Sequence, residues 1–141
     1  MRKSTVLFLC IGNSIRSQMA EGFARQYGQN KMECLSAGIS PGFVHPMAIR
    51  VMKEKGIDIS EHTSKSIESI DLSKVTILVT LCGEAQEVCP TIPQKISKYH
   101  WPFADPCRVL GSEEARLNSF RQVRDGIELK VKQFIEESLS D

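Results

Sequence analysis

The chain has 141 residues, enough to bury a hydrophobic core, and we expect one domain spanning residues 1–141. Its formal net charge is +1 and it has no basic block, so a nucleic-acid partner is not expected. No apolar run approaches the length of a membrane span, and residues 1–4 lead directly into a predicted strand rather than a signal peptide. We therefore expect a cytoplasmic monomer that does not contact a membrane.

Strand-like and helix-like patterns alternate along the chain. Short apolar runs and helical spacing of apolar residues predict strands at 5–10, 32–37, 75–81 and 99–101, and helices at 17–27, 45–55 and 113–139. This alternation predicts an α/β fold, a four-stranded parallel sheet with helices on both faces. The carboxyl ends of the strands then form one edge, where ligands bind in such sheets.

The segment between the first strand and the first helix is the most informative stretch. It runs from Cys10 to Ser17, and we predict that the residues after the cysteine bind the substrate: Ile11, Gly12, Asn13, Ser14, Ile15, Arg16 and Ser17. A loop that enters a helix points several backbone N–H groups into one concavity at the positive end of the helix dipole. The loop is therefore suited to a tetrahedral oxyanion.

Cys10 and Arg16 complete this predicted site. The positive field at a helix start stabilises a thiolate, so Cys10 is the predicted nucleophile. The planar fork of Arg16 fits two oxygens of one anion. The alternative is a buried structural cysteine followed by a surface arginine, and the strand before and helix after favour the functional interpretation. Ser17 can donate to the Cys10 thiolate, cap the helix, or do both.

Cys82 and Cys89 follow the third predicted strand, with Pro90 directly after. If the residues between them are helical, the cysteines lie roughly 10 Å apart, whereas a disulfide needs Cα atoms within roughly 7 Å. Closing this disulfide would unwind the segment, so oxidation would act as a conformational switch. Two buried cysteines or half of a metal site are the alternatives. A redox relay is favoured because Cys10 is expected at the same edge, and no metal site is predicted.

Asp105 follows the last predicted strand and precedes Pro106. A carboxylic acid beside an oxyanion site can protonate a leaving oxygen, although an aspartate before proline is also common in turns. Two further cysteines receive no role: Cys34 is expected in the core, and Cys107 lies near Asp105 in sequence.

These motifs together resemble the thioredoxin-coupled arsenate reductases, which share the fold of the low-molecular-weight protein tyrosine phosphatases. The resemblance covers nearly the whole chain and rests on the loop with Gln18-Met19-Ala20-Glu21-Gly22, Ser36-Ala37-Gly38, Gly56-Ile57-Asp58-Ile59-Ser60, Val79-Thr80-Leu81-Cys82, Cys89-Pro90, His100-Trp101, Asp105-Pro106 and Phe120-Arg121-Gln122-Val123-Arg124-Asp125. A phosphatase of this fold usually has proline after Arg-Ser and tyrosine after Asp-Pro. Here those positions hold Gln18 and Cys107.

The resemblance implies an arsenic-detoxifying enzyme that reduces arsenate to arsenite without a bound cofactor. Cys10 would attack arsenate, and Asp105 would protonate the departing oxygen. Cys82 would then attack Cys10, releasing arsenite, and Cys89 would attack Cys82. Thioredoxin would reduce the final disulfide, each transfer being thiolate attack on sulfur.

Two positions depart from some members of that family. Their potassium site matches Asn13, Glu21, Ser36 and an aspartate where this chain has Lys65, whose ammonium would take the place of the cation near Glu21. A cysteine often stands where Ile15 stands here, so the loop cannot form an internal disulfide with Cys10. Two other functions stay open: a phosphatase acting on phosphate monoesters, and a non-catalytic module that binds arsenite or soft metals through Cys82 and Cys89.

Overall fold

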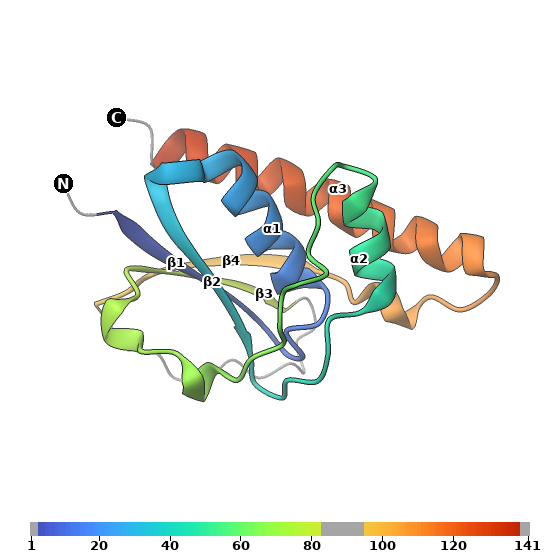
Figure 1. Ribbon diagram of the computed structural model, residues 1–141, viewed down its shortest axis with the longest axis horizontal. Helices are drawn as coiled ribbons and strands as arrows, with labels where there is room; N and C mark the ends of the chain where they lie inside the picture. Colours follow the sequence, from blue (N-terminus) through green and yellow to red (C-terminus); the bar gives the residue numbers. More distant parts are fainter. Residues whose placement is uncertain (1–2, 83–94, 139–141) are drawn as a thin grey trace.

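The computed structural model describes residues 3–82 and 95–138 (Figure 1). Its strands are β1 (Ser4–Cys10), β2 (Met32–Gly38), β3 (Ile77–Cys82) and β4 (Ser97–Phe103), and its α-helices are α1 (Arg16–Gly28), α2 (Pro46–Lys53) and α3 (Glu113–Ser138). Four short 3₁₀ helices join them: η1 (Gln29–Lys31), η2 (Ile67–Ser69), η3 (Leu72–Lys74) and η4 (Pro106–Arg108). Every predicted strand and α-helix is confirmed, with ends that shift by a few residues.

The strands form one four-stranded parallel sheet, as predicted, and the structure gives their order as β2-β1-β3-β4. The register of β1 against β2 runs from Ser4 opposite Met32 to Cys10 opposite Gly38. On its other side β1 pairs with β3, where Leu9 lies opposite Thr80. Cys10 and the backbone of Cys82 therefore end neighbouring strands at the same carboxyl edge, where the predicted site lies.

The two faces of the sheet are covered differently (Figure 1). Val6 and Phe8 of β1 belong to the larger hydrophobic core, which also contains residues of α1, α2 and α3. Leu7 and Leu9, which alternate with them, pack on the opposite face near η2 and η3. Helical segments thus cover both faces. Among the residues that the structure describes, the α-helices share one face, and the helical segments on the other are 3₁₀ helices.

The strand β4 is longer than the predicted 99–101. It lies at one end of the sheet order, and most of its residues are exposed. Ser97, Lys98 and His100 interrupt the apolar residues of this exposed edge strand, so only its centre is visible in the sequence. Among the described residues, no helix is both long and apolar enough to cross a membrane.

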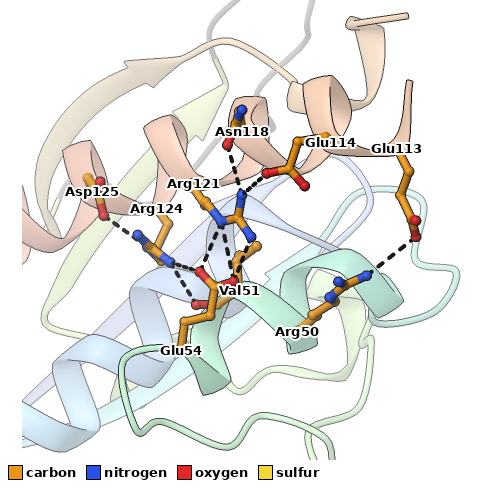
Figure 2. A network of polar contacts seen from close by, with 9 residues as sticks. All are labelled: Arg50, Val51, Glu54, Glu113, Glu114, Asn118, Arg121, Arg124 and Asp125. Carbon is orange, nitrogen blue, oxygen red and sulfur yellow. Dashed lines mark hydrogen bonds and ion pairs between the residues drawn. The ribbon is translucent and has the colours of Figure 1, made fainter. Parts of the chain in front are cut away.

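Charged side chains fix α2 against α3 (Figure 2). Glu54, the residue that ends α2, pairs with Arg124 at 2.7 Å and with Arg121 at 2.8 Å. The Arg124 guanidinium also donates to the Val51 carbonyl at 3.0 Å. This network holds the orientation of α2, whose first turn lies beside the predicted oxyanion loop.

Candidate active site

The predicted nucleophile stands where the sheet meets the first helix. Cys10 is the last residue of β1 and is 2% exposed, and α1 begins at Arg16. The first turn of α1 has no acidic residue and no side-chain cap. The positive end of its dipole is therefore not compensated by its own first turn, and this favours a bound anion or a thiolate.

A short chain of hydrogen bonds leads to the sulfur. The Ser17 Oγ lies 2.9 Å from the Cys10 Sγ, and the Asn13 Nδ2 donates to the Ser17 Oγ at 2.7 Å. Since the Ser17 oxygen accepts from Asn13, its own proton is free to point at the sulfur. The expected donation from Ser17 to Cys10 fits this arrangement. Ser17 does not act as the α1 cap, because it already lies inside the helix.

Asn13 holds the loop in an unusual backbone conformation. Its φ angle is +47°, in the left-handed region that asparagine tolerates better than most residues. Its Oδ1 accepts the backbone N–H of Lys65 at 2.8 Å, and this contact fixes which amide atom faces Ser17. The Gly12 carbonyl accepts the Ser64 hydroxyl at 2.8 Å. Residues 64 and 65 thus fasten the outer side of the loop.

Gly38 permits the loop to pass very close to β2. A Cβ atom at this position would stand 2.6 Å from the Ile11 carbonyl oxygen and 2.7 Å from the Asn13 nitrogen. Both atoms belong to the backbone and cannot move aside without displacing the loop. The sequence shows a glycine at the end of a strand, but the need for this close approach is visible only in three dimensions.

Arg16 connects the loop to two strand ends. The residue is 5% exposed, and its Nη1 donates to the Phe103 carbonyl at 2.8 Å and to the Leu81 carbonyl at 3.3 Å. The guanidinium therefore lies at the carboxyl edge of β3 and β4, next to the backbone that leads into Cys82. Cys89 lies outside the described residues.

The predicted acid, Asp105, caps a turn. Its carboxylate accepts the backbone N–H of Cys107 at 2.9 Å, at the start of η4. This is the turn role that the sequence also allows, and it places the carboxylate at the end of β4. Cys107 is exposed, and partial burial and the nearby Asp105 raise the pKa of its thiol. Burial raises the pKa of the Cys34 thiol to about 11, which agrees with its expected place in the core.

The cation beside Glu21 is Arg25 and not Lys65. Two nitrogens of Arg25 contact the Glu21 Oε2, at 2.7 and 2.8 Å, and Ser36 donates to the Oε1. The Lys65 ammonium donates instead to the Thr63 carbonyl at 2.8 Å. The expectation for Lys65 was wrong because Arg25, one helical turn after Glu21, already occupies the carboxylate.

Two residues that sequence reasoning did not assign also support the loop. The Gln18 Nε2 donates to the carbonyls of Asn13 and Thr63, each at 3.0 Å. Its Oε1 lies 2.9 Å from the His62 Nδ1, and burial lowers the pKa of that histidine. His62 is 44 positions from Gln18, so no local sequence signal links them. Within 3–82 and 95–138, no three His, Cys, Asp or Glu side chains are grouped to hold a metal.

The fold and this loop agree with comparisons to known proteins. The chain belongs to the family described as low molecular weight phosphotyrosine protein phosphatase, which it matches over residues 5–141. Within that family, it is similar to arsenate reductases. Those of Halalkalibacterium halodurans and Bacillus subtilis are each 46% identical over 136 residues, covering 96% of this chain and 98% of theirs.

Solved structures give the same result. An arsenate reductase in a phosphate-binding state has 35% identity and a TM-score of 0.81, over 97% of this chain and 99% of that one. An arsenate reductase in an oxidised state has 35% identity and a TM-score of 0.82, over 95% of this chain and 98% of the other. The low-molecular-weight phosphatase fold expected from the sequence is thereby confirmed.

Proposed function

We propose that this protein reduces arsenate to arsenite through Cys10, with Cys82 and Cys89 as successive resolving thiols and thioredoxin as the reductant. The observation that carries the proposal is the Cys10 sulfur held 2.9 Å from the Ser17 hydroxyl at the uncapped start of α1. Relatives at 46% identity that are arsenate reductases supply the substrate.

The first step joins arsenic to sulfur. The Cys10 thiolate attacks the arsenic atom of arsenate, and an oxygen leaves as water after it gains protons, one of them from Asp105. The amides at the start of α1 and the Arg16 guanidinium hold the remaining oxygens. Asp105 can turn from its η4 contact towards the leaving oxygen, since both lie at the carboxyl edge of the sheet.

The second step reduces the arsenic. The Cys82 thiolate attacks the Cys10 sulfur, and a disulfide forms between them. The arsenic–sulfur bond breaks with its electron pair left on arsenic, so As(V) becomes As(III) and arsenite departs. Cys89 then attacks Cys82, which frees Cys10 as a thiolate and leaves a Cys82–Cys89 disulfide for thioredoxin to reduce.

Arsenate-dependent NADPH oxidation with thioredoxin and thioredoxin reductase tests the overall reaction. Cys10→Ser should abolish turnover, whereas Cys107→Ser, an exposed thiol near the same edge, should retain it. Full turnover by Cys10→Ser would overturn the assignment of the nucleophile. Turnover that glutathione and glutaredoxin support, but thioredoxin does not, would overturn the assignment of thioredoxin as the reductant.

The order of the relay can be read by mass spectrometry of trapped species. Cys82→Ser should stop with arsenic bound to Cys10, because no thiol remains to displace it. Cys89→Ser should release one arsenite and accumulate a Cys10–Cys82 disulfide. Repeated turnover without Cys89 under thioredoxin would contradict this order.

The family match favours a weak second activity, hydrolysis of phosphate monoesters. The same loop can hold a phosphoryl group, and hydrolysis does not need a resolving cysteine. Turnover of p-nitrophenyl phosphate should therefore require Cys10 and be unaffected in Cys82→Ser and Cys89→Ser. Stoichiometric arsenite binding without turnover of either substrate would instead indicate a binding module.

A further inference from the structure

Residues 39–45, which precede α2, form backbone hydrogen bonds with the oxyanion loop near both of their ends. The backbone amides of Ile39 and Ser40 donate to the carbonyls of Cys10 and Ile11, at 3.3 and 2.9 Å. At the far end of the segment, the His45 amide donates to the Ser14 carbonyl at 3.0 Å. His45 is the residue of this segment from which α2 begins.

The imidazole of His45 caps that helix. Its Nδ1 accepts the backbone N–H of Met47 at 3.0 Å, and Pro46 follows as the first helical residue. A nitrogen that accepts a hydrogen bond carries no proton, so the ring is neutral with its proton on Nε2. The cap exists only in this neutral form.

Packing fixes the same ring from a second side. The His45 ring lies 5.0 Å from the ring of Phe120, which is fully buried in α3, and 6.1 Å from that of Phe43. Since α3 is joined to α2 by the Glu54 network, the ring is held between two helices whose relative position is itself fixed. The His45 amide donates to Ser14, and its position is therefore fixed by two sets of contacts of the His45 ring. One is the hydrogen bond from the Met47 amide, and the other is the packing against Phe43 and Phe120.

The charged groups that face this ring are Arg116 of α3 and Asp105 after β4, and Cys107 lies beside both. Burial lowers the pKa of His45, Arg116 lowers it further, and Asp105 raises it. A proton on Nδ1 would remove the cap and add a positive charge at the positive end of α2 and near Arg116. The Asp105 carboxylate would also attract the imidazolium that this proton creates.

We propose that His45 is a positioning residue of the oxyanion loop, holding Ser14 while its neutral ring caps α2, and that protonation of the ring releases this hold. The proposal rests on the proposed function of the loop as an oxyanion site. Oxyanion affinity should then be full when the imidazole is neutral and fall as pH drops through the pKa of His45. That pKa is below the ordinary value of 6.5.

Sulfate is a suitable probe, because its own charge stays constant over this pH range and it is not turned over. Between roughly pH 7.5 and pH 5, the sulfate affinity of the wild-type protein should fall about fivefold more than that of His45→Asn. Asparagine caps a helix without titrating, so this variant should bind like the wild type at neutral pH and lose the extra acid dependence. His45→Ala, which lacks a cap, should bind about fivefold more weakly throughout.

His100→Asn, which removes an exposed histidine of β4, is the matched control and should keep the wild-type acid dependence. The amide signals of Met47 and Ser14 in the unmodified protein should move together with the titration of the His45 ring. This measurement needs no variant and holds even if His45→Ala does not fold.

An acid dependence that His45→Asn shares with the wild type, or a Met47 amide that ignores the titration of His45, would overturn the proposal. The sulfate measurements do not depend on arsenate turnover. If the protein binds sulfate as expected but does not reduce arsenate, the result counts against the proposed function and not against the role of His45. A wild-type protein that binds no sulfate at any pH would overturn both the oxyanion site and the role of His45.

Discussion

Ser17 and Asn13 determine which proton reaches the Cys10 sulfur. Asn13 is oriented by the Lys65 amide and donates to the Ser17 oxygen, so the serine hydroxyl is left to donate to sulfur. A hydroxyl that donates to an anion contributes more than one between neutral groups. The reactivity of Cys10 thus depends on Lys65, which lies 52 positions after Asn13 along the chain.

Replacing Ser17 with alanine should lower the alkylation rate of Cys10 by iodoacetamide at neutral pH by about tenfold. The lost hydrogen bond to a thiolate is worth about 1.5 kcal/mol, which corresponds to roughly that factor. Ser69→Ala is the matched control, since its hydroxyl donates only to the Ser66 carbonyl on an exposed turn. An unchanged alkylation rate in Ser17→Ala would show that the hydroxyl does not donate to the sulfur.

At the scale of secondary-structure elements, the end of β2 shapes the loop that follows β1. The two strands end side by side, with Cys10 opposite Gly38. The loop turns over Gly38 at a distance that no larger residue allows. The oxyanion loop is therefore as much a product of the β1–β2 register as of its own sequence.

Gly38→Ala should reduce turnover by at least tenfold and lower the melting temperature by several degrees. The added methyl group meets two backbone atoms, and overpacking of this kind costs about 1–3 kcal/mol. Gly42→Ala is the matched control, because a Cβ there has no atom of the described residues within 4 Å. A fully active and stable Gly38→Ala protein would mean that the loop can move outward without loss.

The contact between α2 and α3 should depend on pH through Glu54 (Figure 2). Hydrogen bonds from Arg121, followed by those from Arg124, lower the pKa of Glu54 from its ordinary value of 4.5 to about 2. A carboxyl group with a depressed folded-state pKa contributes stability above its unfolded pKa and loses that contribution as pH falls. The contribution of Glu54 should therefore be complete above about pH 5 and disappear between roughly pH 4.5 and pH 2.

Glu54→Gln should lower the melting temperature by about 3 °C at pH 7, a modest shift because the Glu54 side chain is 36% exposed and screened by water. The difference from the wild type should narrow below pH 4.5. Glu113→Gln breaks a pair with Arg50 in which both side chains are mostly exposed, and it should have little effect at any pH. A Glu54→Gln deficit that persists unchanged near pH 2 would refute this assignment.

For the whole molecule, local sequence was enough to predict the four parallel strands, the three α-helices and the position of the loop. The apolar run before Cys10 and the periodic positions of α3 are local signals, and both elements are confirmed. The supports of the site are not local: His62, Lys65 and Phe103 reach it across 44 to 87 positions. The sequence also does not show which of two cations pairs with one carboxylate. The prediction that Lys65 lies beside Glu21 was wrong for that reason, because Arg25 pairs with Glu21 instead.

The pairing of Glu21 makes a prediction for the stability of the whole protein in different salts. Both Glu21 oxygens are engaged, one by Arg25 and one by Ser36, and Glu21 is buried. A potassium ion would have to displace the guanidinium and lose most of its hydration, so it gains little here. Melting temperatures in potassium and sodium chloride at equal ionic strength should therefore agree within error.

Arg25→Gln provides the counterpart to that measurement, because it frees one oxygen of Glu21 and removes the competing charge. This variant should be less stable in sodium and regain part of the loss in potassium, which the freed carboxylate can then coordinate. Lys31→Gln, which removes an exposed lysine from η1, should show no such difference. A potassium-specific rise in the melting temperature of the unmodified protein would mean that a cation enters despite Arg25, and the ion pair would not be what fills the space beside Glu21.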